Sequence, residues 1–276
     1  MKSTGSDALV QQVVERFADT PDPRLREILG SLVRHLHGFI RETGLTEREW
    51  MQGIEFLTAV GQKCDDRRQE FILLSDVLGA SMQVVAVQSA RAPGCTESTV
   101  FGPFHVEGAP QVADGGDVAR GAKGTPCTVR GTVRDSDGRA LAGATLDVWQ
   151  SDDDGLYDVQ RPGLQGAQGR GVLKSQGDGS FRFESVVPVP YPIPTDGPVG
   201  DLLRASRRPC QRPAHLHFRI QAPGCETLIT HVFRSGDPHL GADPVFGVRP
   251  SLVADWPEAG PGRHELKFDF VLQRIG

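Results

Sequence analysis

The chain has 276 residues, with 30 Lys and Arg against 35 Asp and Glu, and a formal net charge of −5. This length suits one large or two modest domains and is enough to bury a hydrophobic core. Acidic and basic residues are mixed along the chain without a long basic stripe, so the composition argues against nucleic acid or an anionic membrane as a partner.

The N-terminal segment, MKSTGSDALVQQ, lacks the apolar core of a signal peptide. No apolar run elsewhere approaches the ~18 residues needed to cross a bilayer. The five scattered cysteines include no CxxC pair, so neither a disulfide framework nor a zinc–thiolate site is predicted. We therefore expect a cytoplasmic protein with no membrane span.

The chain is predicted to be helical up to about residue 90. Apolar residues recur at helical spacing between residues 28 and 40. Thr46 and Glu49 then form a capping-box pattern ahead of EWMQGIEFLTAVGQ. The following stretch, RRQEFILLSDVLGASMQVVAV, predicts one more amphipathic helix.

From about residue 106, short β-branched runs alternate with turns rich in Gly and Pro. Residues 127–150 predict a strand, a tight SDG turn and a second strand. Strands are also predicted for SFRFESV, LHFRIQA, TLITHVF and HELKFDFVL. We predict an α+β protein in which a helical domain at residues 1–105 precedes an all-β sandwich at residues 106–276.

Two histidines one residue apart, His215 and His217, lie in the stretch RPAHLHFRI. Side chains two positions apart share one face of a strand, so this pair could bind a metal ion together. An equally good alternative is that both are polar residues on a solvent-exposed face. His35 and His37 have the same spacing but lie in a predicted helix, about 200° apart around its axis, so we do not expect them to bind one ion.

A metal site needs further donors, usually a carboxylate or a third nitrogen. Glu226 follows His217 at a spacing that does not match the cupin pattern well, whereas His231 and His239 are candidate nitrogen donors. The acidic run at 152–154 is predicted to form a solvated turn instead.

The chain has only two tyrosines against 13 phenylalanines. Tyr157 follows the turn after the LDVWQ strand, and Tyr191 lies in the proline-stiffened loop PVPYPIPTDGP. A lone tyrosine in a loop usually only packs. Two phenolates with two imidazoles, however, would carry two negative charges and suit a hard trivalent cation, for which ferric iron is the obvious biological choice.

Three of these stretches, WQSDDDGLY, PYPIPTDGPVG and RPAHLHF, together resemble the intradiol ring-cleavage dioxygenases, which are non-haem Fe(III) enzymes. The resemblance covers nearly the whole chain. The N-terminal stretch from RHLHGF to LLSD, and the later blocks STVFGPFHVEGAP and THVFRSGDPHLGADPVFGV, are most similar to the hydroxyquinol 1,2-dioxygenase branch.

The resemblance implies that Tyr157, Tyr191, His215 and His217 bind the iron and that Arg212 is the active-site arginine. Tyr191 is implied to leave the metal and take a substrate proton, while Arg212 stabilises the anionic substrate. The implied substrate pocket consists of Leu73, Asp76, Val100, Phe101, Gly102, Pro103, Phe104, Ile193, Pro194, Thr195 and Val245.

The implied reaction inserts O2 between the two adjacent hydroxyls of hydroxyquinol (benzene-1,2,4-triol) and gives 3-hydroxy-cis,cis-muconate, which tautomerises to maleylacetate. The resemblance also implies a homodimer formed through the N-terminal helices, in some members with an amphipathic lipid between the subunits. One run departs from the family pattern, because Pro209-Cys210-Gln211 replaces the usual histidine–proline–aromatic run before the arginine. His231 stands where the catechol-cleaving branch tends to carry glutamine, which favours the hydroxyquinol branch.

Three alternatives stay open at this point. The first is another specificity within the family, for catechol or chlorocatechol. The second is a non-enzymatic binding module, because RGTVRDSDGRALAGATLDVW is similar to transthyretin-like sandwiches. The third is a zinc hydrolase, which metal analysis would exclude.

Overall fold

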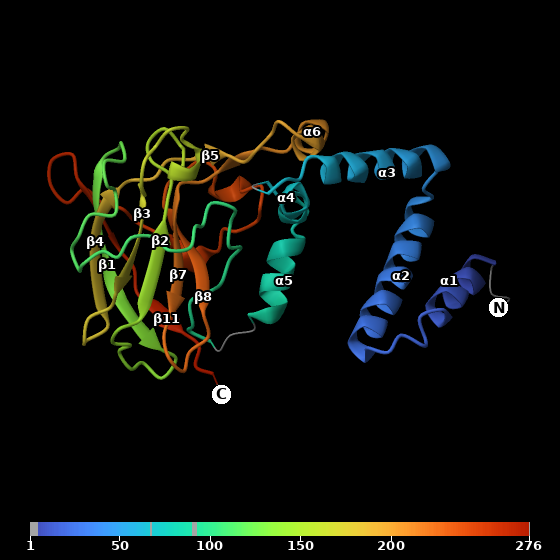
Figure 1. Cartoon of the computed structure of the whole chain (residues 1–276), viewed down its shortest axis with the longest axis horizontal. Coiled ribbons are helices and arrows are strands. Elements are labelled where there is room, and N and C mark those ends of the chain that lie inside the picture. The colour runs from blue at the N-terminus through green and yellow to red at the C-terminus, as the bar shows by residue number, and fades with distance from the viewer. Residues whose placement is uncertain (1–4, 67, 90–92, 276) are drawn as a thin grey trace. The chain divides into compact units, whose positions relative to one another are not determined.

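The computed structural model describes residues 5–66, 68–89 and 93–275 (Figure 1). Residues 1–4, 67, 90–92 and 276, which fall within the predicted ranges, lie outside the described residues. The chain divides into two compact units, Met1–Ala59 and Val60–Gly276. This division falls earlier than the domain boundary expected after residue 105, which stays a prediction.

The first unit contains α1 (Gly5–Glu15), α2 (Pro23–Thr43) and most of α3 (Glu47–Gln62). α2 begins at a proline, and the carboxylate of Asp22 before it accepts the N–H of Arg24 at 2.8 Å. Before α3, the N–H of Thr46 donates to Oε2 of Glu49 at 2.9 Å, and the N–H of Glu49 donates to the Thr46 hydroxyl at 3.3 Å. The predicted capping box is therefore confirmed.

The helix predicted for residues 67–87 is wrong in one respect, because two helices form there. α4 (Glu70–Val77) and α5 (Ala80–Gln88) are bent by 76° at their break. Gly79 lies in the break with a φ of +75°, a left-handed conformation that glycine adopts without a steric penalty. Among the described residues no single helix has the length and hydropathy to cross a membrane. The bent pair of α4 and α5 has that length and hydropathy only when the two helices are taken together.

The strands of the second unit form two larger sheets and one short ribbon (Figure 1). The first sheet is built around β1 and consists of β1 (Pro126–Asp135), β4 (Ser180–Val186), β10 (His264–Lys267) and β11 (Phe270–Leu272). The second has the order β3 (Arg170–Lys174), β2 (Thr145–Trp149), β7 (His215–Gln221), β8 (Leu228–Arg234) and β9 (Val253–Ala254). The ribbon pairs β5 (Tyr191–Pro192) with β6 (Gln211–Arg212).

Short helices complete this unit: α6 (Pro198–Ala205), η1 (Asp158–Gln160), η2 (Leu240–Ala242) and η3 (Pro250–Leu252). The inner side chains of the two larger sheets share one hydrophobic core. The ring of Phe218 in β7 lies 4.7 Å from that of Phe270 in β11 and 6.5 Å from that of Phe183 in β4, measured between centroids. This core fixes the second sheet, and β7 in particular, from behind.

The strand, tight turn and second strand predicted for residues 127–150 are confirmed, with β1 and β2 as the two strands. The tight turn forms, since the N–H of Asp135 donates to the Arg139 carbonyl at 2.9 Å. However, β1 and β2 belong to different sheets, so the chain crosses the core between them. Apolar residues of both strands are buried in the same core, as the crossing requires.

The stretch HELKFDFVL forms two strands, β10 and β11, which both pair with β1 in parallel. Between them the chain bulges inward at Phe268, whose carbonyl oxygen lies 1.7 Å from where a Cβ on Gly131 would stand. Only glycine fits at this point of β1.

Candidate metal centre

His215 and His217 lie on one face of β7, and each is 1% exposed. The opposite face carries Leu216, Phe218 and Ile220, which are part of the hydrophobic core. The strand alternation predicted from the sequence is confirmed. The alternative, that the two histidines are polar residues on a solvent-exposed face, is wrong.

The two tyrosines meet these histidines in a buried ring of donor atoms. Tyr157 Oη lies 2.9 Å from His217 Nε2, and Tyr191 Oη lies 3.3 Å from His215 Nε2. The two phenol oxygens are 3.2 Å apart, and the two Nε2 atoms are 3.1 Å apart. The structure thus brings together all four residues that the sequence motifs single out, from three separate segments of the chain.

These distances fit a single bound ion. Two donors that each lie about 2.1 Å from one metal are about 3.0–3.4 Å apart when the angle at the metal is between 90° and 110°. The Nδ1 atom of His215 lies 2.7 Å from the Pro213 carbonyl. Since a carbonyl can only accept, Nδ1 carries the ring proton and Nε2 keeps its lone pair for a ligand bond.

Burial favours the neutral forms of His215, His217 and Tyr157. Burial, with the charge of Arg212 second, lowers the pKa of His215 to about 3. Burial also holds the pKa of His217 well below its ordinary value, and it raises the pKa of Tyr157 well above its ordinary value. The imidazoles are therefore in the form that binds metals, whereas the Tyr157 phenol would ionise only beside a cation.

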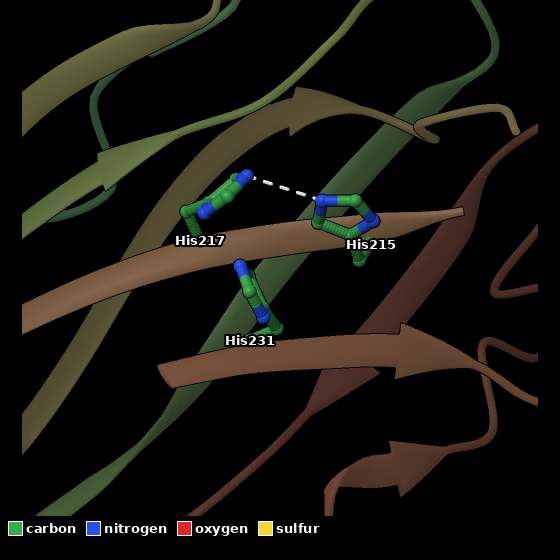
Figure 2. Close-up of side chains that lie close together, drawn as sticks. All are labelled: His215, His217 and His231. Carbon is green, nitrogen blue, oxygen red and sulfur yellow. Dashed lines mark hydrogen bonds between the residues drawn. The ribbon is translucent and has the colours of Figure 1, made fainter. Parts of the chain in front are cut away.

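A third histidine, His231 of β8, lies against this pair (Figure 2). Its side chain is fully buried, and one donor atom from each of the three histidines lies within 4.8 Å of the others. Of the nitrogen and carboxylate candidates expected from the sequence, only His231 reaches the site. His239 precedes η2 and Glu226 is exposed, and neither belongs to the cluster.

Arg212 is 3% exposed, and its Nη1 atom lies 3.3 Å from His215 Nε2. Asp243 holds the guanidinium from the other side, because Arg212 Nε donates to Oδ1 at 3.1 Å and Nη2 to Oδ2 at 3.3 Å. Burial alone would raise the pKa of Asp243, but the charge and hydrogen bonds of Arg212 outweigh it and keep that pKa below its ordinary value. Asp243 was not predicted from the sequence, although it lies two residues before the predicted pocket residue Val245 in the stretch GADPVFGV.

Three predicted pocket residues lie beside the ring of donors. Phe104 stacks on Tyr157 with 4.4 Å between centroids, and Phe101 packs edge-on against Trp149. Gly102 has a φ of +80°, and a Cβ there would stand 3.0 Å from Cε1 of His217. The backbone therefore approaches this histidine more closely than a side chain would allow.

The other predicted pocket residues vary in exposure. Asp76 is 8% exposed, and burial raises the pKa of its carboxyl group, while the charge of Arg212 acts in the opposite direction. Pro103 is exposed. The remainder are buried or half-buried: Leu73, Val100, Ile193, Pro194, Thr195 and Val245.

The acidic turn before Tyr157 differs from the prediction in one residue. Asp153 and Asp154 are exposed as expected, but Asp152 is 4% exposed. Its carboxylate pairs with Arg161 and accepts the N–H of Asp154 at 3.1 Å, so it stabilises the turn. The expectation of a wholly solvated turn is therefore wrong.

Two known protein-family models together match most of this chain. Residues 100–274 match the family model described as "Dioxygenase", and residues 22–96 match "Catechol dioxygenase N terminus". The chain is 62% identical to the 6-chlorohydroxyquinol 1,2-dioxygenase of Cupriavidus pinatubonensis over 96% of both chains. This chain belongs to the intradiol ring-cleavage dioxygenase family.

This intradiol dioxygenase is also 55% identical to the hydroxyquinol 1,2-dioxygenase of Rhodococcus opacus, over 92% of this chain and 85% of that one. Among solved structures, the hydroxyquinol 1,2-dioxygenase of Pseudomonas putida matches with a TM-score of 0.93 and 47% identity, over 98% of this chain and 99% of that one. The predicted class, a helical region followed by a sheet-rich catalytic domain, is confirmed. A non-enzymatic binding module is excluded.

Proposed function

We propose that this intradiol dioxygenase is a non-haem Fe(III) enzyme that cleaves hydroxyquinol between its two adjacent hydroxyls. The product would be 3-hydroxy-cis,cis-muconate, which tautomerises to maleylacetate. The observation that carries the proposal is the buried ring of two phenol oxygens and two imidazole nitrogens, with distances of 2.9–3.3 Å between neighbours. The names of the similar proteins support the choice of substrate.

Tyr157, Tyr191, His215 and His217 would hold the iron. Two phenol oxygens make this donor set harder than the nitrogen- and sulfur-rich sets typical of zinc, which favours ferric iron over the zinc hydrolase considered from the sequence. When bound, ferric iron supplies the Lewis acidity that stabilises the doubly deprotonated diol and makes it reactive towards O2.

Tyr191 is the residue we assign to proton transfer. Its Oη lies between Tyr157 Oη and His215 Nε2, at 3.2 and 3.3 Å. Its backbone pairs with Arg212 in the β5–β6 ribbon, so the phenol and the guanidinium share one support. The Tyr191 oxygen would accept one of the two hydroxyl protons of the diol as the substrate enters.

Arg212 would stabilise the negative charge of the bound diol. Burial would lower the pKa of this guanidinium, but Asp243 outweighs burial and raises the pKa above its ordinary value. The positive charge is therefore permanent, and it is held in a site from which solvent is excluded.

Asp76 is the residue we assign to recognition of the third hydroxyl. Burial raises the pKa of its carboxyl group, although a hydrogen bond to Ser81 and the charge of Arg212 act in the opposite direction. A hydroxyl on the substrate could hydrogen-bond to this carboxyl, whereas catechol and chlorocatechol have no hydroxyl to offer there. With such substrates the buried carboxyl would keep its hydrogen bond to Ser81 but lack the one to the third hydroxyl, and this difference discriminates against them.

The remaining predicted pocket residues would shape the space around the ring. Phe101, Gly102 and Phe104 line it at the metal donors, and we propose that Leu73, Val100, Pro103, Ile193, Pro194, Thr195 and Val245 complete it. This assignment of the pocket residues is supported by their position in segments next to the metal donors. The 1–105 and 106–276 division and the cytoplasmic location stay predictions.

We also propose a homodimer formed through the N-terminal helices. α2 exposes a run of large apolar side chains at helical spacing, each 45–57% exposed: Leu25, Ile28, Leu32, Leu36 and Phe39. Such a stripe on a helix normally packs against a partner. An amphipathic lipid between the subunits is a further part of this prediction.

Metal analysis and visible absorption test the proposed site. We expect one iron per chain and a coloured protein, because tyrosinate-to-ferric charge transfer absorbs visible light. His215→Ala should lose the iron, whereas His35→Ala, which alters a histidine of the same spacing on α2, should keep it. Tyr191→Phe should retain much of the iron but lose most turnover. A colourless protein that contains iron would contradict the tyrosine ligands.

A further inference from the structure

His231 is a buried histidine that lies beside the four proposed metal donors but is not one of them. It lies directly across from His217 in the β7–β8 pairing. Its ring centroid is 4.2 Å from that of His217 and 4.8 Å from that of His215 (Figure 2). Its side chain is 0% exposed, and its Nε2 atom has no hydrogen-bond partner in the described part of the chain.

The other ring nitrogen is held by Thr99. The Thr99 hydroxyl lies 2.8 Å from His231 Nδ1, and the residue itself is 2% exposed. The backbone N–H of Thr99 donates to the Ile229 carbonyl at 2.9 Å, which fixes Thr99 beside β8. The hydroxyl is therefore in a defined position relative to the imidazole.

This contact determines which nitrogen carries the proton. Across residues 5–66, 68–89 and 93–275, His231 Nδ1 is the one hydrogen-bond partner of the Thr99 hydroxyl. The hydroxyl proton therefore has only Nδ1 to donate to, and leaving a buried O–H without an acceptor would be costly. Nδ1 accepts, so the single proton of the neutral imidazole resides on Nε2.

An Nε2–H cannot bind a metal, because its lone pair is taken by the proton. His231 is thus suited to donate a hydrogen bond rather than to act as a third nitrogen ligand. It also adjoins the guanidinium of Arg212. A Cβ on Gly247 would stand 3.7 Å from His231 Nδ1, 3.1 Å from Arg212 Nη2 and 3.1 Å from Asp243 Oδ2, so one backbone position borders all three side chains.

We propose that His231 is a neutral hydrogen-bond donor that contacts an anionic oxygen of the bound diol, and that Thr99 is the positioning residue that holds it in the Nε2–H tautomer. The proposal rests on the proposed function, because it is that function which places a diol in this site. Within it, His231 is a catalytic residue outside the metal ligands, and it acts beside Arg212 on the same charge.

The first test compares His231→Leu, which removes the donor, with His231→Gln, which keeps an N–H. Iron content is measured for each, and the dissociation constant of 4-nitrocatechol, a coloured diol, is measured by optical titration. Both variants should keep one iron per chain. His231→Leu should bind 4-nitrocatechol about tenfold more weakly, the loss expected of a hydrogen bond to a charged group, and His231→Gln within about threefold of the parent.

The second test needs neither iron nor substrate. The nitrogen chemical shifts of His231 in metal-free protein labelled with ¹⁵N-histidine distinguish a protonated from a bare Nε2. The parent and Thr99→Ser should show a protonated Nε2. Thr99→Val, which has the same shape without the hydroxyl, should show a mixture of tautomers or the Nδ1–H form.

Loss of iron from both His231 variants would make His231 a ligand and overturn the proposal. Unchanged 4-nitrocatechol binding in His231→Leu, or a bare Nε2 in the parent, would also overturn it. If the parent itself bound no iron, the proposed function would fail. The tautomer measurement would still decide what Thr99 does, so the two failures are distinguishable.

Discussion

The guanidinium of Arg212 is oriented by a carboxylate 31 residues further along the chain. The carboxylate of Asp243 accepts two hydrogen bonds from the guanidinium, and it also accepts one from the backbone N–H of Gly247 at 2.9 Å. One side chain thereby connects the arginine to the loop that carries Val245. The position of the positive charge in the site depends on this carboxylate as much as on the arginine.

Asp243→Asn should therefore lower kcat/KM for hydroxyquinol about 10- to 100-fold, because a displaced guanidinium no longer faces the substrate charge. Iron content and the visible absorption of the resting enzyme should change little. Asp255→Asn, which alters an exposed carboxylate bonded to Ser235, is the matched control and should be neutral. Parent-like kcat/KM in Asp243→Asn would contradict this role.

The same pair predicts a pH dependence with a definite sign. The pKa of Asp243 is held below its ordinary value in the folded chain. Its contribution to stability is then fully present above the ordinary aspartate pKa and is lost as the pH falls through the lowered value. The acid-unfolding curve of Asp243→Asn should lack this component.

Some residues of the site could be predicted from the sequence, and others could not. Tyr157, Tyr191, His215 and His217 could be predicted because each lies in its own motif, and because the strand period places both histidines on one face. Asp243, Thr99 and the buried pair of Arg170 with Asp158 could not, since their partners are brought to them only by tertiary packing. Sequence spacing carries no information about such contacts.

Elements were predicted well where the pattern is local and less well where backbone geometry intervenes. The capping box of α3 and the alternation of β7 depend on neighbouring residues and are confirmed. The break between α4 and α5 depends on Gly79, which is tolerated inside many helices and so gives a weak signal. The separation of β1 from β2 depends on which sheet each strand joins, which a hairpin-like pattern does not reveal.

Gly131→Ala tests the element scale through the bulge between β10 and β11. The added methyl group would stand 1.7 Å from the Phe268 carbonyl oxygen, so the parallel pairing must open. We expect a loss of about 3 kcal/mol in the free energy of unfolding, at the upper end for overpacking. Gly177→Ala, with nothing within 4 Å of the new Cβ, should change it by less than about 0.5 kcal/mol.

Equal denaturation midpoints for these two variants would show that the bulge accommodates a side chain. Because β1, β10 and β11 pack on the core side opposite β7, the iron content of folded Gly131→Ala should nevertheless match that of the parent. Chemical denaturation followed by circular dichroism gives the first quantity, and metal analysis of the folded fraction gives the second.

At the scale of the whole molecule, the exposed apolar stripe of α2 predicts association. The chain has a mass of 29.9 kDa, so sedimentation should give about twice that value. The double variant Leu32→Glu with Leu36→Glu should sediment as a single chain. Lys174→Glu with Lys267→Glu, which adds negative charge to exposed strand positions, should remain a dimer. A parent that sediments as one chain would contradict the assignment.

Oxygen uptake with product identification tests the proposed cleavage of hydroxyquinol most directly. Supplied with ¹⁸O2, the iron-loaded enzyme should consume one O2 per hydroxyquinol and place both labelled atoms in maleylacetate, with kcat/KM at least about tenfold above that for catechol. An iron-free sample corrects for spontaneous oxidation of the substrate. Cleavage of catechol as efficiently as hydroxyquinol, or a hydroxyquinol product without both labelled atoms, would contradict the account.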